Sequence, residues 1–248
     1  MNDTQQNLWI YGAVPAGASL EELERRDGLP EVWIVEAGDL GAIVGTPPPD
    51  SPKGTRDQAL AHARVLEAAI VDAPVVPFRF GTELPGGDDV VGSDLLEPYG
   101  DELSRQLQAV KDVVQMTVKA YYDEDSVLSE IIERHPELRQ LQAQTRRGSQ
   151  TATHGARVEF GELLYKALDL RRTRDSAAIT DRLQRVSLAA NPGELESEFM
   201  VLAVAFLVRR DRIDKFERAV EKLADASGGS MRFVLLGPMP AYNFLDLE

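Results

Sequence analysis

One nine-residue stretch constrains the fold more than any other part of the chain. It spans residues 74–82 and reads Pro-Val-Val-Pro-Phe-Arg-Phe-Gly-Thr. Its valines and phenylalanines favour a strand, its prolines restrict where ladder hydrogen bonds can form, and its glycine permits a turn. The stretch is therefore predicted to be a buried strand that ends at Gly81.

Arg79 lies between the two phenylalanines of this stretch. A buried guanidinium without a partner is very unfavourable. The side chain must therefore extend to water at the sheet edge or pair with a carboxylate. A structural ion pair is the preferred interpretation, and a functional role stays open.

The charge and cysteine content exclude several classes of function. The 248 residues carry 27 basic and 41 acidic side chains, a net charge of −14. Phosphate-backbone binding depends on clustered Lys and Arg, so nucleic acid is not an expected partner. The chain has no cysteine, which excludes disulfides, thiol catalysis and thiolate metal sites and fits a reducing cytoplasm.

Neither export nor a membrane span is expected. Residues 1–7 are polar and lack the basic-then-apolar layout of a signal peptide. The most apolar run, residues 199–208, is ten residues long, whereas a spanning helix needs about 20.

The N-terminal half predicts alternating strands and helices. Residues 8–14 are apolar on both alternating faces, which is typical of a central strand. Residues 19–26 predict a short helix. Residues 32–37 and 40–44 predict an antiparallel hairpin that turns at Gly38-Asp39.

A proline-rich connection over residues 46–54 leads to a capping box at Thr55–Gln58, which begins a helix to about Asp72. After an acidic loop, a single helix is predicted from near Ser93. Four apolar residues mark one side of this helix: Leu96, Leu103, Leu107 and Val110.

The C-terminal half begins with alternating apolar residues over 114–120, which predict a strand with one buried and one solvent-exposed face. Residues 126–134 look helical, and Pro136 breaks or restarts that helix. The polar middle, residues 142–155, is interpreted as part of a projecting helix, a helical hairpin or a loop.

The remaining elements complete a second alternation. Residues 176–183 predict a helix and residues 186–190 a strand, followed by a turn at 191–193. Residues 199–208 fit a strand or a buried helix, and we prefer the strand. An apolar stripe from Ile213 to Leu223 predicts a helix that Gly228-Gly229 terminates, and residues 231–237 predict the last strand. The proline-rich tail after it is not expected to continue in a ladder.

These elements predict an α+β protein with two domains, 1–109 and 110–248, each with an antiparallel sheet and helices. Both halves give the order β-α-β-β-α-β. The C-terminal domain is expected to be ferredoxin-like, with its first crossover enlarged into a helical excursion over about 126–184.

No catalytic or metal-binding motif is visible. The three histidines, His62, His135 and His154, lie in separate segments, and the spacing of His62 favours a structural or surface role. Neither a serine elbow nor a phosphate loop is present. The acid clusters at 88–89 and 123–125 are interpreted as solvated loops.

Five segments distributed from end to end carry a resemblance to a known family. They are residues 8–14 (Leu-Trp-Ile-Tyr-Gly-Ala-Val), 60–67 (Leu-Ala-His-Ala-Arg-Val-Leu-Glu), 74–82, 203–208 (Ala-Val-Ala-Phe-Leu-Val) and 236–244 (Leu-Gly-Pro-Met-Pro-Ala-Tyr-Asn-Phe). On these segments the chain resembles the GvpF/GvpL family of gas vesicle proteins. The chain departs from the family pattern at Met239, where an aromatic residue is usual, and residues 142–155 carry the least of the resemblance.

The resemblance implies a non-enzymatic minor component of the gas vesicle, a cytoplasmic gas-filled shell built from a small, very hydrophobic major protein. The implied partners are that shell protein and other accessory proteins, with no cofactor, no nucleic acid and no membrane. Ten residues of the motifs are candidates for a structural or interface role: Tyr11, Gly12, His62, Pro77, Arg79, Phe80, Gly81, Gly237, Pro238 and Tyr242.

One hypothesis connects this resemblance to the charge. An acidic body could keep an aggregation-prone subunit in solution while an exposed apolar strand edge or groove engages it. Two alternatives stay open: a regulatory module that binds a small molecule between ferredoxin-like domains, and a hydrolase or transferase with a dispersed site, in which Arg79 would be tested first.

Overall fold

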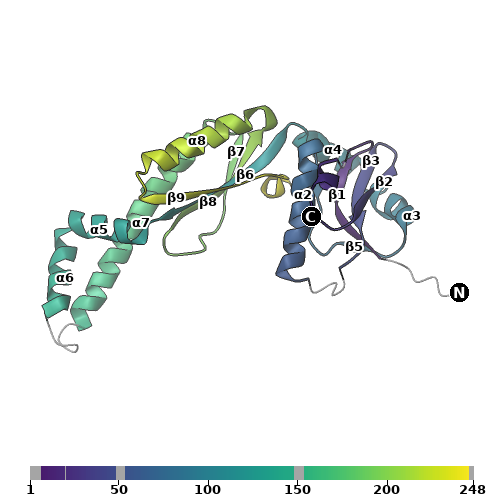
Figure 1. Cartoon of the computed structure of the whole chain (residues 1–248). Helices are drawn as coiled ribbons and strands as arrows, with labels where there is room; N and C mark the ends of the chain where they lie inside the picture. The colour runs from purple at the N-terminus through teal and green to yellow at the C-terminus, as the bar shows by residue number, and fades with distance from the viewer. Residues whose placement is uncertain (1–6, 20, 49–53, 148–153, 246–248) are drawn as a thin grey trace. The chain divides into compact units, whose positions relative to one another are not determined.

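The structure is a computed structural model that describes residues 7–19, 21–48, 54–147 and 154–245. The chain divides into two compact units (Figure 1). Unit 1 comprises the described residues within 1–116, 207–213 and 236–248, and unit 2 comprises those within 117–206 and 214–235. The predicted α+β class with two antiparallel sheets is confirmed. The domains 1–109 and 110–248 stay a prediction; the units differ from them because two C-terminal segments group with the N-terminal residues.

Unit 1 is built on a sheet with the order β2-β3-β1-β4, in which β5 also pairs with β1. All of its strand pairs are antiparallel. The strands are β1 (Leu8–Pro15), β2 (Val32–Ala37), β3 (Leu40–Gly45), β4 (Val76–Pro77) and β5 (Glu83–Leu84). The predicted hairpin turn joins β2 to β3, and Gly38 adopts the positive φ (+60°) that such a turn requires.

Helices cover both faces of this sheet, which explains why β1 is buried along almost its whole length. The helical elements of unit 1 are α1 (Glu21–Arg25), α2 (Arg56–Asp72), α3 (Asp88–Val90), the π-helical turn η1 (Val91–Leu96), α4 (Gly100–Val110), and the 3₁₀ turns η2 (Arg210–Arg212) and η3 (Tyr242–Phe244). The predicted capping box is confirmed at the start of α2: Gln58 N–H donates to Thr55 Oγ1 at 3.3 Å, and Thr55 N–H donates to Gln58 Oε1 at 2.6 Å.

Two predictions for unit 1 are wrong in extent. Of residues 74–82, only Val76–Pro77 form a strand, because the chain turns away after Phe78. The helix predicted from Ser93 is two pieces, η1 and α4, separated by residues 97–99. Pro98 accounts for the break, since it has no N–H to donate and disfavours helical backbone at the residue before it.

Arg210 fixes the end of α2 from a distant part of the chain. Its guanidinium donates to the carbonyl oxygens of Ile70 at 2.6 Å and Ala73 at 3.3 Å. The last carbonyls of a helix have no partner inside the helix, so a cation there is favourable. Burial lowers the pKa of Arg210, and the charge of Asp112 opposes that shift.

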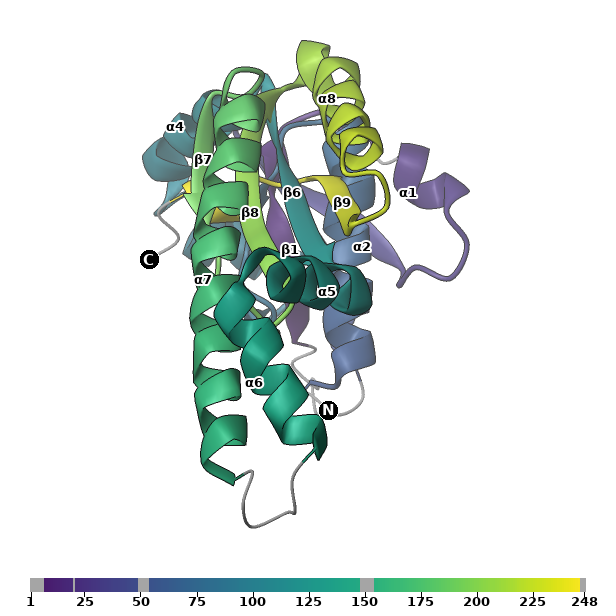
Figure 2. The ribbon, with the colours of Figure 1, turned by 90° about the vertical axis from the view of Figure 1, so that its left-hand side faces the viewer.

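Unit 2 contains most of a second sheet, with the order β7-β8-β6-β9. Its strands are β6 (Val113–Tyr122), β7 (Ala189–Pro192), β8 (Met200–Arg209) and β9 (Met231–Met239), and its helices are α5 (Glu124–Arg134), α6 (Pro136–Arg147), α7 (His154–Gln184) and α8 (Ile213–Ala226). Helices α7 and α8 lie on one face of the sheet (Figure 2). From β6 onward the order is β-α-β-β-α-β with three helices in the first crossover; the ferredoxin-like assignment stays a prediction.

Helices α6 and α7 run side by side in both ribbon views (Figures 1 and 2), as the helical-hairpin interpretation expects. Pro136 begins α6, where the missing N–H of a proline is tolerated. Residues 148–153 of the predicted polar middle lie outside the described residues, as do residues 49–53 of the proline-rich connection and residues 1–6. None of the helices in the described ranges is long and apolar enough to cross a membrane.

The strand predictions for the C-terminal half are partly right. The preferred strand at 199–208 is confirmed as β8, and α8 ends before Gly228 and Gly229, which have φ of +57° and +86°. The strand predicted at 186–190 is instead β7, which includes Asn191 and Pro192 of the predicted turn. The proline-rich tail was also wrongly excluded from the ladder, because β9 runs through Pro238 to Met239.

Candidate functional site

All ten candidate residues from the sequence motifs lie in unit 1. Tyr11 and Gly12 come from β1 and His62 comes from α2. The residues from Pro77 to Gly81 follow the edge of the sheet, and Gly237, Pro238 and Tyr242 come from the end of the chain. The fold therefore gathers residues as far apart in the sequence as Tyr11 and Tyr242 into one unit.

A β-bulge in β1 sends two consecutive residues toward α2. The register with β3 shifts between Ile10 and Gly12, so Tyr11 is the extra residue. Gly12 then faces the α2 side, where a Cβ would lie 2.7 Å from Val76 O and 3.1 Å from Leu66 Cδ2. Position 12 has no room for a side chain, because the neighbouring backbone fills that space.

His62 joins β1 to the segment after β4. Trp9 Nε1–H donates to His62 Nδ1 at 3.0 Å, so the ring is the neutral tautomer with its hydrogen on Nε2. That nitrogen donates to Phe78 O at 3.3 Å. Burial lowers the pKa of His62, with the hydrogen bond to Phe78 opposing it. Both ring nitrogens are occupied within unit 1, so His62 acts as a connector and has no free nitrogen for proton transfer.

Aromatic rings surround this histidine. Tyr11 stacks on it with centroids 4.9 Å apart, and Phe80 meets it edge-on at 5.7 Å. Phe80 also meets Trp9 edge-on at 5.2 Å. Burial raises the pKa of Tyr11 to about 12, so its hydroxyl stays protonated near neutral pH. The cluster of Trp9, Tyr11, His62 and Phe80 fixes the segment from Phe78 to Phe80 against β1.

Arg79 extends away from this cluster. The chain turns after it: Thr82 N–H and Oγ1–H donate to Arg79 O at 3.1 and 2.8 Å, and Gly81 has a φ of +94°. The Arg79 side chain is exposed, and none of the carboxylates in the described ranges forms an ion pair with it. The structural ion pair preferred from the sequence is therefore wrong for the described residues, because the turn carries the guanidinium to the surface.

The end of the chain is held by a buried glutamine. Gln115 Nε2–H donates to Asn243 Oδ1 at 2.8 Å, and Asn243 N–H donates to Gln115 Oε1 at 3.0 Å. Gly237 lies against the same strand, where a Cβ would be 2.7 Å from Gln115 O, and its φ is +122°. The bond between Gly237 and Pro238 is cis. These contacts bring Tyr242 into unit 1.

A cavity of about 810 Å³ opens beside these elements. Its apolar lining comes from α2, β4, η1 and α4, and its polar lining includes Arg79, Glu102, Gln106 and Tyr242. The described residues that line it are Ala59, His62, Ala63, Val76, Pro77, Phe78, Arg79, Phe80, Thr82, Leu95, Tyr99, Glu102, Leu103, Gln106 and Tyr242. Five of the ten candidate residues (His62, Pro77, Arg79, Phe80 and Tyr242) therefore line one cavity.

Several residues of this site were missed by the sequence reasoning. Trp9 lies within the first motif but was not singled out, although a tryptophan N–H in an otherwise apolar strand signals a buried partner. The alternation of apolar residues placed Gln115 on the solvent-exposed face of its strand, but the side chain is buried. Tyr99 and Glu102 gave no signal, because only the tertiary structure brings α4 to the cavity.

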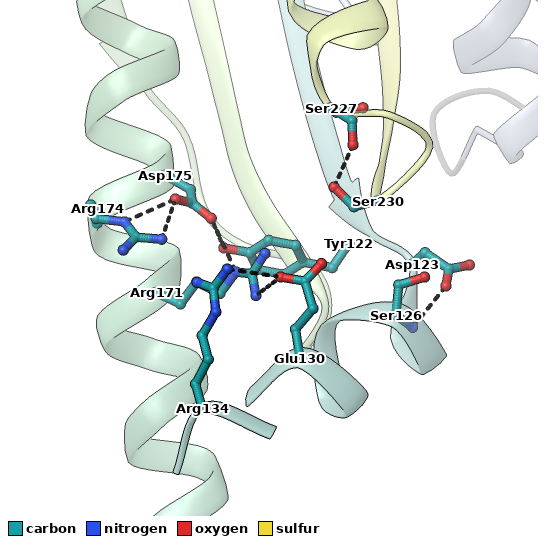
Figure 3. Close-up of polar contacts among 10 residues, drawn as sticks. All are labelled: Tyr122, Asp123, Ser126, Glu130, Arg134, Arg171, Arg174, Asp175, Ser227 and Ser230. Carbon is teal, nitrogen blue, oxygen red and sulfur yellow. Dashed lines mark hydrogen bonds and ion pairs between the residues drawn. The ribbon is translucent and has the colours of Figure 1, made fainter. Parts of the chain in front are cut away.

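A different cluster holds the helices of unit 2 (Figure 3). Arg171 on α7 donates to Glu130 at 2.8 Å and to Asp175 at 3.3 Å, and Tyr122 Oη–H donates to Asp175 at 2.9 Å. Burial and then the hydrogen bond to Asp175 raise the pKa of Tyr122. This network joins β6, α5 and α7, and a structural role accounts for every contact in it.

The two acid clusters have structural partners as well. Asp88 accepts from Trp33 Nε1–H at 3.1 Å, and Asp123 caps α5 by accepting from Ser126 N–H at 3.0 Å. Within the described ranges, no group of three or more potential ligands is arranged to hold a metal ion.

Comparison with known proteins decides the family. The family model described as "Gas vesicle synthesis protein GvpL/GvpF" matches residues 7–246. The chain belongs to the GvpL/GvpF family. Among relatives, it is 33% identical to gas vesicle protein F of Streptomyces sp. (strain CB03234), over 97% of this chain and 100% of that protein. It is 22% identical to gas vesicle protein F of Haloferax mediterranei, over 98% and 94%.

Solved structures of GvpF share the fold. The crystal structure of GvpF from Anabaena sp. PCC7120 matches with a TM-score of 0.77 and 20% identity, over 98% of this chain and 99% of that one. GvpF from Microcystis aeruginosa matches with a TM-score of 0.71 and 17% identity, over 96% and 98%. This GvpL/GvpF chain is a gas vesicle accessory protein.

Proposed function

We propose that this chain acts in gas vesicle assembly by binding the major hydrophobic shell protein and other gas vesicle accessory proteins. The observation that carries the proposal is the family match over residues 7–246, because it spans both units and not one segment alone. A cytoplasmic, non-enzymatic role at the gas vesicle is part of the same proposal.

The α6–α7 hairpin offers a surface for this binding. Val158 and Tyr165 of α7 are 49% and 57% exposed, and a separation of seven residues places them on the same side of the helix. Exposed apolar residues of this size suit a hydrophobic partner, and the net charge of −14 would keep the complex in solution.

Co-purification of the full chain with the major shell protein tests the proposal. Two variants accompany it: a chain without residues 142–155, and the double substitution Val158→Thr/Tyr165→Thr. Leu188→Thr is the matched control, since Leu188 is exposed to a similar degree but lies outside α7. We expect the full chain and the control to retain the shell protein, and the double variant to retain much less.

The outcomes separate the surface from the function. Equal retention by all the variants would keep the function and exclude the α7 surface. Absence of the shell protein from every sample, including the full chain, would overturn the proposed function.

A further inference from the structure

The cavity in unit 1 has the size and composition of a ligand site. Its volume of about 810 Å³ lies within the roughly 300–1,000 Å³ of small-molecule pockets, which are mainly apolar with a few polar groups. Side chains such as Phe78, Leu95 and Leu103 supply apolar walls. Because α2, η1, α4 and the segment 76–82 all contribute, the site is concave and built from several elements.

The charges that line the cavity favour an anion. Among the described residues of its lining, Glu102 is the only carboxylate, and Arg105 and Gln106 Nε2–H, the latter at 2.8 Å, both bond to it. Of the described lining residues, Arg79 is the only arginine or lysine, and no carboxylate of the described ranges pairs with it. Arg79 therefore offers a positive charge to a ligand, although the net charge of −14 of the chain opposes anion binding.

Tyr242 adds a second donor. Its hydroxyl forms no hydrogen bond with the residues that the structure describes, and the ring lines the cavity. Burial, and then the charge of Glu67, raise its pKa, so the hydroxyl keeps its proton. A phenol and a guanidinium are each able to donate a hydrogen bond to a carboxylate.

The backbone of the lining segment discriminates against a peptide ligand. Phe78 N–H donates to Tyr11 O at 2.8 Å, and Phe78 O accepts from His62. Arg79 O accepts from Thr82, and Thr82 O accepts from Ile10 N–H at 2.9 Å. Pro77 has no N–H. A peptide could not pair its amides with these backbone groups, because they are already bonded, whereas an alkyl chain needs no such partners.

We propose that this cavity binds a small monocarboxylate with an apolar chain, of the fatty-acid class, with the chain among the apolar side chains and the carboxylate at Arg79 and Tyr242. The ligand site goes beyond the proposed function and is independent of the α7 surface. It lies within unit 1.

Isothermal titration calorimetry with the full chain tests this assignment. The probe is decanoate, used below its micellar concentration, and the neutral comparison is decyl maltoside, which carries an alkyl chain of similar length. We expect saturable decanoate binding, at least tenfold tighter than any binding of decyl maltoside. Decanoate should also raise the unfolding temperature, as any ligand of the native state does.

Three substitutions localise the site. Arg79→Gln removes the charge and should weaken decanoate binding about tenfold, and Tyr242→Phe should weaken it about threefold. Ala63→Leu adds carbon atoms to the apolar lining and should weaken both probes equally. The matched control is Arg64→Gln, which removes an exposed charge from α2 outside the cavity and should leave decanoate binding unchanged.

Three results would overturn the proposal. They are no saturable binding of decanoate by the wild-type chain, equal affinity for decanoate and decyl maltoside, and equal loss of affinity in Arg79→Gln and Arg64→Gln. Thermal unfolding of each variant without ligand establishes that the compared proteins are folded. Retention of the shell protein is measured separately, so failure of this proposal leaves the assembly function in place.

Discussion

The two units hold their elements together by different means. In unit 1, α2 meets β1 through a neutral histidine, stacked rings and a glycine whose missing side chain permits close approach. In unit 2, α5 and α7 meet β6 through Arg171, Glu130 and Asp175. Adding a Cβ to a closely packed glycine produces a steric clash. A partly exposed network of ion pairs tolerates substitution better, and salt screens its charges. All the motif residues singled out from the sequence belong to unit 1.

The optical probes of this chain separate the two units. Both tryptophans, Trp9 and Trp33, belong to unit 1, so tryptophan fluorescence follows the unfolding of that unit. Far-UV circular dichroism includes the long helices of unit 2. A two-unit protein need not unfold in one step, so each substitution below is followed by both probes.

The largest effect is expected at Gly12, and Gly161 provides the comparison in unit 2. Gly12→Ala should destabilise unit 1 by about 3 kcal/mol, since the new Cβ would meet Val76 O at 2.7 Å. Gly161→Ala, in α7, has open space around it and should stabilise unit 2 by about 0.5–1 kcal/mol, because alanine favours helix. Urea denaturation measures both changes. The comparison would be contradicted if Gly161→Ala destabilised unit 2 or if Gly12→Ala left the free energy of unfolding unchanged.

The second largest destabilisation is expected from removal of the His62 side chain. His62→Ala leaves the buried Trp9 N–H without its acceptor and removes the ring between Tyr11 and Phe80, which should cost about 2–3 kcal/mol in the fluorescence transition. His135→Ala is the control, because His135 is exposed and bonds only to nearby Glu137 among the contacts described. Similar losses in the two variants would argue against a connector role for His62.

A smaller loss of stability is expected when the ion network of unit 2 is disrupted. Arg171→Met keeps the apolar stem, removes the charge and leaves Glu130 37% exposed to water, so we expect a loss of about 1–2 kcal/mol. The loss should appear in circular dichroism more than in fluorescence and should shrink at high salt. A salt-independent loss of equal size in both probes would show that the network does not act as a local electrostatic contact.

The smallest effect is a pH dependence. The folded-state pKa of His62 lies below its ordinary value of 6.5, so the unfolded chain binds the extra proton first as pH falls. The contribution of neutral His62 is therefore fully present above about pH 6.5 and is lost between that pH and the lowered folded pKa. His62→Gln, whose amide can accept from Trp9 N–H, should flatten this part of the stability profile. An unchanged profile would contradict the neutral tautomer.

The candidate site was only partly predictable from the sequence. The motif at 74–82 contains Arg79 and Phe80, which line the cavity, and the structural role favoured for His62 fits the hydrogen bonds of both its ring nitrogens. The strand predicted over 74–82 was too long, because local propensity cannot show that the chain turns after Phe78. The ion pair of Arg79 was wrong for the described residues, because the partners of an exposed side chain depend on the tertiary structure. The roles of Tyr99, Glu102 and Arg210 depend on contacts between segments far apart in the chain.

The sequence by itself determined the class, most elements and the family. Periodicity, capping at Thr55 and the glycines at 38, 228 and 229 are local signals, because each rests on backbone geometry within a few residues. The tertiary structure alone decided that β9 continues through Pro238, that the last residues group with the first, and that a cavity opens at Arg79. Those outcomes depend on long-range packing and on which polar groups find partners, and neither is encoded in the spacing of neighbouring residues.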